Sequence, residues 1–423
     1  MTMTDSPAVG GTATTGRLGP IAPKDRIFTL DMLRGWAILG ILAVNALAFV
    51  WPAALEMTTG LPEPWPASPA NILGSWVTDV FFQDKFRSLF SMLFGVSIFL
   101  IGGERSDVAR GKLLRSRLFW LAVFGLIHGL AVWFGDILLH YAYCALIVML
   151  MRSWKASRLI WAGAGLNLLI GVLSAASALA EATHGGGGAT AVGDGSAFAP
   201  TPEMLTATIH AYQSGWPSAQ IENLKAWALL QGASLLVLPI TVGLMALGLG
   251  LFKSGFLTGR SPTWVYVLML VIGGGNLAAF GWFEWIRVHA SEGADPTRGL
   301  AGVAGSFAPL ITLGYVSLLI LMTRFGLKPL TQVLAPVGRM AFTNYLTQSL
   351  IMASLFYMPW GPLWFGSMGP GQLWWVIGGV WVAQLVWSPL WLSVFAMGPL
   401  EWVWRCLTYG RRVPLTKAAV ARG

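Results

Sequence analysis

Charged residues are scarce in this 423-residue chain. Lys, Arg, Asp and Glu together make up 11% of it, whereas hydrophobic residues make up 55%. Soluble globular domains carry about 25% charged residues. With a mean hydropathy of +0.65, the composition excludes an ordinary soluble domain and predicts an integral membrane protein whose first partner is the lipid bilayer.

Cysteine and the common catalytic motifs are also nearly absent. The two cysteines are Cys144, inside an apolar run, and Cys406, in a basic terminal segment. They are expected on different levels of the bilayer, so we predict two free thiols. The chain has no P-loop, HExxH or GxSxG motif and no clustered Cys and His, so no metal is expected.

Acidic residues are outnumbered by basic ones, 18 to 27, which gives a net charge of +9. The basic residues lie in short clusters between apolar runs, as in the loop at 105–117. This distribution is typical of the positive-inside rule rather than of a nucleic-acid surface. We therefore expect no nucleic-acid partner and two cytoplasmic termini.

Long apolar runs are abundant. A hydrocarbon core of about 30 Å requires about 20 helical residues. Such runs occur near residues 33–51, 76–102, 118–134, 137–151, 159–180, 226–251, 263–283, 302–323, 340–357 and 373–397. No alternating strand pattern competes with them. The predicted fold class is therefore all-α, a polytopic membrane bundle of about ten transmembrane helices.

The remaining segments suggest a domain organisation. We expect a disordered cytoplasmic tail at 1–25, five-helix membrane halves at 26–180 and 226–400, and a basic interfacial tail at 401–423. Between the halves, 181–225 is predicted to be an extracytoplasmic loop with a Gly-rich tract followed by a short helix. That loop is either a lid over an external cavity or a flexible insertion whose helix lies on the membrane surface.

Two histidines and a carboxylate interrupt the apolar stretch "FGLIHGLAVWFGDILLHYA", at His128, Asp136 and His140. Ionisable groups at membrane depth are costly unless paired or hydrated. A neutral imidazole is a suitable general base, and a carboxylate one helical turn from His140 would orient it. The alternatives are a structural histidine at His128, a helix N-cap at Asp136 and an interfacial histidine at His140.

Charge is also concentrated at the external entry of the second span, "TDVFFQDKFRSLFSMLFG". The candidate substrate-binding residues here are Asp79, Asp84, Lys85 and Arg87. Arg and Lys can bind an anionic group. The alternative is that these four residues form an internal ion-pair network.

Polar residues occur in two further spans. Asn344 and Gln348 lie one turn apart on the ninth span and would line a polar cavity or join helices. The candidates for holding a phosphate-bearing cofactor on the cytoplasmic side are Asp31, Arg34, Asn45 and Arg339. A structural Asp–Arg pair is the alternative for the first two.

Five stretches in order resemble the motifs of the YeiB-like bacterial inner-membrane family, over about residues 26–412. They are "LDMLRGWAILGILAVN", "KFRSLFSMLFG", "GLIHGLAVWFGDILLHYA", "GRMAFTNYLTQSL" and "GPLEWVWRCLTYGR". More distantly, the chain resembles transmembrane acyltransferases such as the lysosomal heparan-glucosaminide acetyltransferase. That resemblance implies transfer of an acyl group from cytoplasmic acyl-CoA through a membrane-buried histidine, a role that falls here to His128.

The leading hypothesis is therefore acyl transfer to a hydroxyl or amine of an extracytoplasmic, glycan or lipid-linked acceptor. His128 would be the base, Asp136 or His140 its orienting partner, and Asn344 and Gln348 donors to the oxyanion. Arg34 and neighbouring loop cations would hold the phosphates of acyl-CoA. The alternatives are a small-solute transporter with a polar midplane site and a non-catalytic scaffold or sensor without a cavity. A homodimer is compatible with each.

Overall fold

The computed structural model describes residues 27–57, 63–183, 201–289 and 297–421. This part of the chain is helical apart from turns and one isolated bridge between Phe395 and Thr416. The expected disordered tail at 1–25 and the Gly-rich tract at 184–200 lie outside the described residues. The all-α prediction is confirmed.

The helices in chain order are α1 (Phe28–Val50), α2 (Ala54–Met57), α3 (Pro69–Val77), the π-helix η2 (Thr78–Phe82), α4 (Lys85–Gly102), α5 (Val108–Ala131), α6 (Leu138–Met151), α7 (Ala156–Thr183), α8 (Pro202–Gln213), α9 (Trp216–Leu236), α10 (Leu238–Lys253), α11 (Thr263–His289), α12 (Arg298–Gly305), α13 (Ala308–Arg324), α14 (Lys328–Gln332), α15 (Leu334–Arg339), α16 (Ala341–Phe356), α17 (Pro370–Val394), α18 (Pro399–Tyr409) and α19 (Lys417–Ala421). Several begin with proline in the first turn, where the missing N–H costs nothing.

Within the described residues, six helices are individually long and apolar enough to cross a membrane, and eight spans result if each of two bent pairs counts as one. The bent pairs are α9 with α10, at 62°, and α12 with α13, at 51°. Helix α6, with 14 residues, and α16, with 16, are shorter than a full span. The chain is a multi-pass membrane protein, and the expected count of ten is not confirmed.

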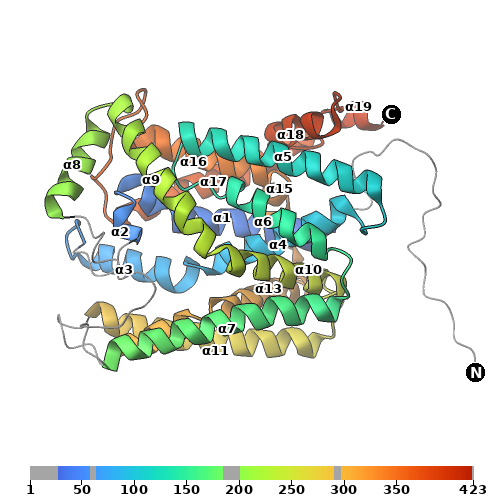
Figure 1. Ribbon diagram of the computed structural model, residues 1–423, viewed down its shortest axis with the longest axis horizontal. Helices are drawn as coiled ribbons and strands as arrows, with labels where there is room; N and C mark the ends of the chain where they lie inside the picture. Colours follow the sequence, from blue (N-terminus) through green and yellow to red (C-terminus); the bar gives the residue numbers. More distant parts are fainter. Residues whose placement is uncertain (1–26, 58–62, 184–200, 290–296, 422–423) are drawn as a thin grey trace, which may run out of the picture.

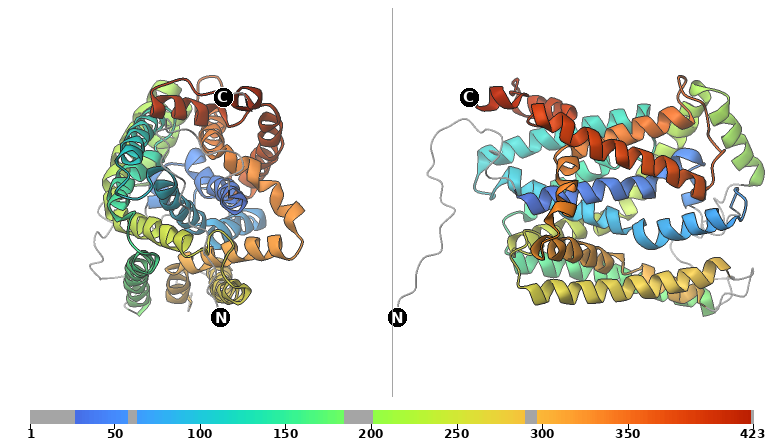
Figure 2. Two further views of the ribbon diagram at one scale, coloured as in Figure 1. Left: turned by 90° about the vertical axis from the view of Figure 1, so that its right-hand side faces the viewer. Right: turned by 180° about the vertical axis from the view of Figure 1, so that it is seen from behind.

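The long helices run side by side, with α1 and α4 in the middle of the bundle and α7 and α11 together along one side (Figures 1 and 2). The most apolar window of α1 is 72% buried, whereas those of α7 and α11 are only 22% buried. Because α7 and α11 are apolar yet exposed, their outer faces are suited to lipid. Helix α1 is the core around which the others pack.

Glycines allow α1 and the short helix α15 to cross closely. A Cβ atom at Gly35 would overlap the Leu334 carbonyl, and one at Gly338 would overlap the Asp31 carbonyl. Only glycine permits this contact. The crossing brings Arg339, at the end of α15, next to the first turns of α1.

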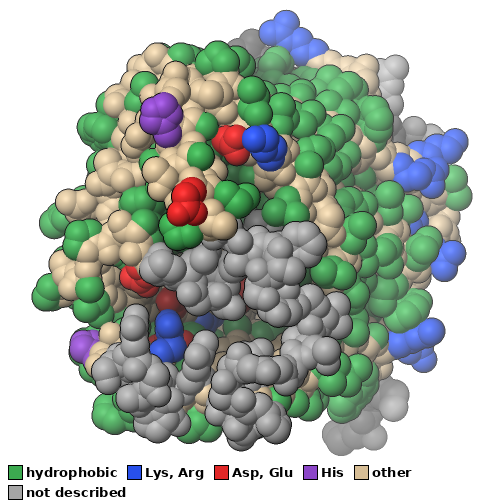
Figure 3. Space-filling view, turned by 60° about the vertical axis from the view of Figure 1, so that its left-hand side comes forward, with side chains coloured by type: hydrophobic (Ala, Val, Ile, Leu, Met, Phe, Trp, Pro, Cys, Tyr) green, Lys and Arg blue, Asp and Glu red, His purple; other side chains and the backbone are tan. Residues whose placement is uncertain are grey.

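The two ends of the bundle differ. Helix α8 lies at one end, and α18 and α19 lie at the other (Figure 1). Hydrophobic side chains cover the flank of the molecule, and lysines and arginines lie beyond it along the right edge in Figure 3. The short helix expected in the 181–225 loop corresponds to α8. Because α9 already begins at Trp216, the loop is shorter than expected.

Helix α8 docks on the bundle through its last turn. The ring of Tyr212 stacks on that of Phe365 at 3.9 Å, and Gln213 Nε2 donates to the Phe365 carbonyl at 2.8 Å. Cys144 and Cys406 are both free, as predicted.

Candidate active site

His128 and Asp136 form a buried pair. His128 Nδ1 lies 2.9 Å from Asp136 Oδ1, and their side chains are 2% and 0% exposed. The second carboxylate oxygen accepts the Leu139 N–H in the first turn of α6 at 2.9 Å. Asp136 is therefore both a helix cap and the partner of an imidazole. The arrangement fixes the orientation of the His128 ring and leaves Nε2 available.

The two glycines beside His128 allow this pair to form. A Cβ at Gly125 would meet the backbone of Leu139 and the Asp136 carboxylate, and one at Gly129 would meet the Trp227 indole. Glycine at 125 lets the start of α6 lie directly against α5, and glycine at 129 makes room for Trp227 of α9.

The turn between α5 and α6 is clamped from outside by α9 and α16. Asn223, on α9, is 1% exposed and accepts the Phe134 N–H at 2.7 Å while donating to the Gly129 carbonyl at 3.1 Å. The Tyr357 hydroxyl, just after α16, donates to the Val132 carbonyl at 2.7 Å. These contacts hold the turn that returns Asp136 to His128.

His140 lies apart from that pair, so the structure does not bring it to Asp136. Its ring nitrogens lie 2.7 Å from the Tyr143 hydroxyl and 2.8 Å from Thr241 Oγ1, on α10. The Tyr143 hydroxyl in turn bonds Ser234 on α9 at 2.5 Å. The expected stacking of Asp136 and His140 fails because α6 begins only at Leu138, after the turn.

A cavity of about 550 Å³ enters the bundle between α1, α4, α5, α6, α15, α16 and α18. Its inner walls are largely apolar, with Leu93, Phe94 and Leu121 among them, and its deep end includes Leu138 and Tyr141. Its charged lining residues lie at the start of α1, on α5, at the end of α15 and on α18, and this charged side is here named the mouth of the cavity. An apolar interior with charged groups at the mouth suits an amphiphilic anion.

Five arginines contribute to the lining of this cavity. They are Arg34, Arg110, Arg117, Arg339 and Arg405, with Asp31 and Glu401 as the acidic residues. Arg34 lies 3.4 Å from Asp31 and donates to Ser97 Oγ at 3.0 Å. The Arg117 guanidinium stacks on the Trp404 ring at 3.5 Å. Asp31, Arg34 and Arg339, which were expected together, do share this cavity, whereas Asn45 is not among its lining residues.

Glu401 anchors α18 across the mouth of the cavity. Its carboxylate accepts the backbone N–H groups of Phe342 and Thr343, at 2.8 and 3.1 Å, and the Thr343 hydroxyl at 2.5 Å. It therefore caps α16 from another helix. Burial raises the pKa of Glu401 above its ordinary value, against the effect of these hydrogen bonds.

Tyr345 links the cavity to the imidazole–carboxylate pair. It lines the cavity, and its ring centroid lies 5.4 Å from that of His128. His128 Nε2 and the Tyr345 hydroxyl are both buried, and neither forms a hydrogen bond with another side chain within the described residues. His128 does not itself line the cavity, so the route from the mouth ends at Tyr345.

Asn344 and Gln348 point away from His128, into contacts with α17 and α1. Asn344 Nδ2 donates to the Val337 carbonyl and to Ser388, and its Oδ1 accepts from the Trp387 indole. Gln348 Nε2 donates to the Ile38 carbonyl and to Gln384. The structure thus joins Asn344, Gln348, Gln384, Trp387 and Ser388 in one buried group, here named the amide cluster. Both N–H donors of each α16 amide are used, so helix joining is the interpretation that fits.

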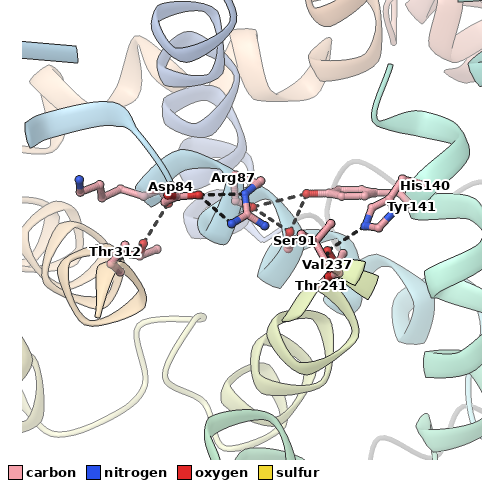
Figure 4. A network of polar contacts seen from close by, with 10 residues as sticks. Asp84, Arg87, Ser91, His140, Tyr141, Val237, Thr241 and Thr312 are labelled. Atoms are coloured by element: carbon pink, nitrogen blue, oxygen red, sulfur yellow. Dashed lines mark hydrogen bonds and ion pairs between the residues drawn. The ribbon is translucent and has the colours of Figure 1, made fainter. Parts of the chain in front are cut away.

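The charged residues of the second span separate into two groups. Asp84 has a left-handed backbone, with φ of 62°, and its carboxylate bonds Arg87 at 2.7 Å. From Arg87 a chain of contacts passes through Ser91 and Tyr141 toward α6 (Figure 4). The Ser91 and Tyr141 hydroxyls lie 2.6 Å apart.

Lys85 and Asp79 belong to the second group, which includes α11. Lys85, 2% exposed, donates to the Asp79 carbonyl at 2.7 Å and lies 4.3 Å from the centre of the Phe280 ring. Arg287 pairs with Glu284 at 2.5 Å and with Asp79 at 3.8 Å. The four candidates are therefore largely engaged with one another and with α11. No group of three or more metal-ligating side chains occurs in the part of the chain that the structure describes.

Three residues of the site were missed or undervalued by sequence reasoning. Tyr345, Asn223 and Glu401 are not among the candidate residues that the sequence alone indicated. Buried polar side chains next to a turn, as at Asn223, leave no recognisable motif. For Glu401 the hydroxyl and free N–H groups at the start of α16 were an available signal.

Comparison with known proteins finds uncharacterised relatives. A family model described as "Protein of unknown function (DUF418)" matches residues 251–411. YeiB of Escherichia coli (strain K12) is 32% identical over 364 residues, covering 79% of this chain and 84% of YeiB. YxaH of Bacillus subtilis (strain 168) is 29% identical over 427 residues, covering 95% and 98%.

An uncharacterised 39.9 kDa protein of Bacillus acidopullulyticus is 26% identical over 411 residues, covering 94% of this chain and 98% of that protein. No solved structure matches. The match to YeiB extends over most of both chains and the DUF418 match covers the C-terminal helices, as the five sequence motifs predicted. The chain therefore belongs to the YeiB-like DUF418 family of membrane proteins.

Proposed function

We propose that the protein is an acyltransferase of the bacterial inner membrane that uses acyl-CoA from the cytoplasm and an acceptor hydroxyl or amine from the other side. The observation that carries the proposal is the arginine-lined, apolar cavity that ends at Tyr345, beside the buried His128–Asp136 pair. A non-catalytic scaffold would not require such a cavity.

Donor binding follows from the cavity walls. Arg34, Arg117 and Arg339 offer guanidinium donors suited to phosphate, and the interior accepts the pantetheine arm that joins the phosphates to the thioester. The thioester carbonyl would then lie at the deep end, near Tyr345. Because His128 lies behind Tyr345, that ring must turn aside for the thioester and the acceptor to meet at Nε2.

The chemistry assigned to this site is nucleophilic acyl transfer. His128 Nε2 takes the proton of the acceptor O–H or N–H as the acceptor atom bonds the thioester carbon. Asp136 holds Nδ1–H and stabilises the imidazolium, while the Tyr345 hydroxyl donates to the developing oxyanion. The C–S bond then breaks, and the leaving thiolate receives the proton from Nε2.

Binding and transfer can be tested separately on the purified protein in nanodiscs. Thermal shift or calorimetry with acetyl-CoA and longer acyl-CoAs should give saturable binding that Arg117→Ala weakens and His128→Gln keeps. The matched control is Arg115→Ala, an exposed arginine two residues away that does not line the cavity. Absence of binding by every acyl-CoA, or equal loss in Arg115→Ala, contradicts the proposal.

A small-solute transporter is the second candidate, favoured by the two bent helix pairs α9–α10 and α12–α13. Interrupted helices at membrane depth are typical of transporter binding sites. Proton-coupled uptake into proteoliposomes that depends on His140, together with no binding of acyl-CoA, would favour transport.

A further inference from the structure

A second cavity, of about 400 Å³, lies at the end of the bundle opposite the mouth of the arginine-lined cavity. Its walls come from Trp51, directly after α1, from the segment at 64–71, which includes the first residues of α3, and from the segment at 366–372, which includes the first residues of α17. It shares no lining residue with the arginine-lined cavity. The acyl-transfer proposal does not use it.

Among the residues that the structure describes, the lining of this cavity contains no charged side chain. Two indole rings, of Trp51 and Trp65, lie with centroids 5.6 Å apart and planes tilted by 57°. Polar groups are supplied by the hydroxyls of Ser68 and Ser367 and by the amide of Gln372. A ligand that matches these walls is uncharged, has apolar faces and carries several hydroxyls.

The cavity is held in shape by contacts that do not involve a ligand. The Trp51 indole donates to the Met368 carbonyl at 2.9 Å. The Asn71 amide donates to the Pro66 carbonyl at 2.9 Å and accepts the Gly371 N–H at 3.1 Å, which joins two of the three wall segments. A wall fixed in this way loses little conformational entropy when a ligand binds.

One buried donor in the cavity wall has no protein partner. The Trp65 indole N–H is buried and has no acceptor within the described residues. The amide of Gln372, also in the wall, is exposed. A buried donor without an acceptor is unfavourable, so a ligand hydroxyl that accepts from Trp65 would be stabilising.

We infer that this cavity binds a neutral carbohydrate ring. The C–H bonds on one face of a pyranose carry partial positive charge and pack on the negative face of an indole, while the ring hydroxyls pair with amides and hydroxyls. The lack of a carboxylate in the wall disfavours a quaternary ammonium ligand, for which an aromatic site also exists in principle. The inference stands whether or not the protein transfers acyl groups.

Saturation-transfer difference NMR on the protein in lipid nanodiscs tests this site without glycosidic detergents. The probes are methyl β-glucoside, N-acetylglucosamine and maltose. Sorbitol is the open-chain control and choline the cationic control. We expect at least one pyranose to bind with its C–H face in contact and sorbitol and choline to give no signal.

Variants place the signal in the cavity. Trp65→Ala should weaken binding about tenfold, and Trp65→Phe should keep it within a few-fold because an aromatic face remains. Gln372→Ala changes an exposed residue that is safe for folding and should weaken binding a few-fold. Trp360→Ala, in the same connecting segment but 70% exposed and outside the cavity, is the matched control and should bind as the wild type does.

Three outcomes overturn the inference. They are no response to any pyranose, binding of choline in preference to sugars, and sugar binding that Trp65→Ala and Gln372→Ala leave unchanged.

Discussion

Two buried polar groups on neighbouring helices use their hydrogen-bonding capacity differently. In the amide cluster, both N–H donors of Asn344 and Gln348 are paired with α17, α1 or the α15 backbone. In the His128–Asp136 pair, Nδ1 of the imidazole bonds the carboxylate, whereas His128 Nε2 has no hydrogen-bond partner in the part of the chain that the structure describes. Buried polar groups whose hydrogen-bond donors are all paired join helices, whereas buried polar groups with an unpaired atom beside a cavity are available for chemistry.

The largest expected effect separates the two histidines. If His128 is the base, His128→Gln should lower the acyl-transfer rate by about 10²- to 10⁴-fold, because the proton then has no acceptor. His140→Gln should leave most activity, since His140 is engaged with Tyr143 and Thr241. The measurement is transfer of labelled acetyl from acetyl-CoA to membrane acceptors, and equal loss in both variants would refute the assignment.

Tyr345→Phe removes the hydroxyl while keeping the ring that lines the cavity. Loss of one oxyanion donor should lower kcat by about 10²- to 10³-fold with little change in acyl-CoA binding. Comparison of single-turnover rates with donor affinity gives the two quantities separately. An unchanged kcat would mean that the hydroxyl does not contact the reacting carbonyl.

The amide cluster should respond in stability rather than activity. Gln348→Leu leaves the Ile38 carbonyl and the Gln384 amide without their partner, at a cost of about 1–3 kcal/mol. Adding Gln384→Leu should return part of that loss, since one of the stranded groups is then removed. The midpoint of thermal unfolding in detergent measures this, and a double variant no more stable than the single would contradict the pairing.

The smallest expected effect concerns the docking of α18. Because the pKa of Glu401 is raised in the folded state, that state holds its proton at pH values where the unfolded chain has already lost it. Stability should therefore fall as pH rises from the ordinary Glu range through the raised value. Glu401→Gln, compared by thermal unfolding across acidic to neutral pH, should flatten this dependence.

Much of the fold followed from composition and apolar run length, because backbone groups in lipid must be satisfied within helices. Counting spans was less successful. Helices α6 and α16 match the runs at 137–151 and 340–357 closely but are shorter than a full span, and two of the spans are bent. Run length does not show where a helix breaks inside an apolar segment.

The sequence indicated several residues of the candidate site but not which of them contact one another. His128 and Asp136 were both identified, but Asp136 was equally suited to His140, and the choice depends on the backbone of the 132–137 turn. On α16 the sequence favoured Asn344 and Gln348, yet Tyr345 faces the cavity. In an almost uniformly apolar helix the hydrophobic pattern does not show which face packs against which neighbour.

Helix α9 extends without interruption from Trp216 to Leu236 and contacts the surroundings of both buried histidines. Near its start, Asn223 holds the turn that carries Asp136 to His128, and near its end Ser234 bonds the tyrosine that contacts His140. Both imidazole environments therefore depend on the position of one helix. A tilt of α9 at the α8 end of the molecule would disturb the surroundings of His128 and of His140 together.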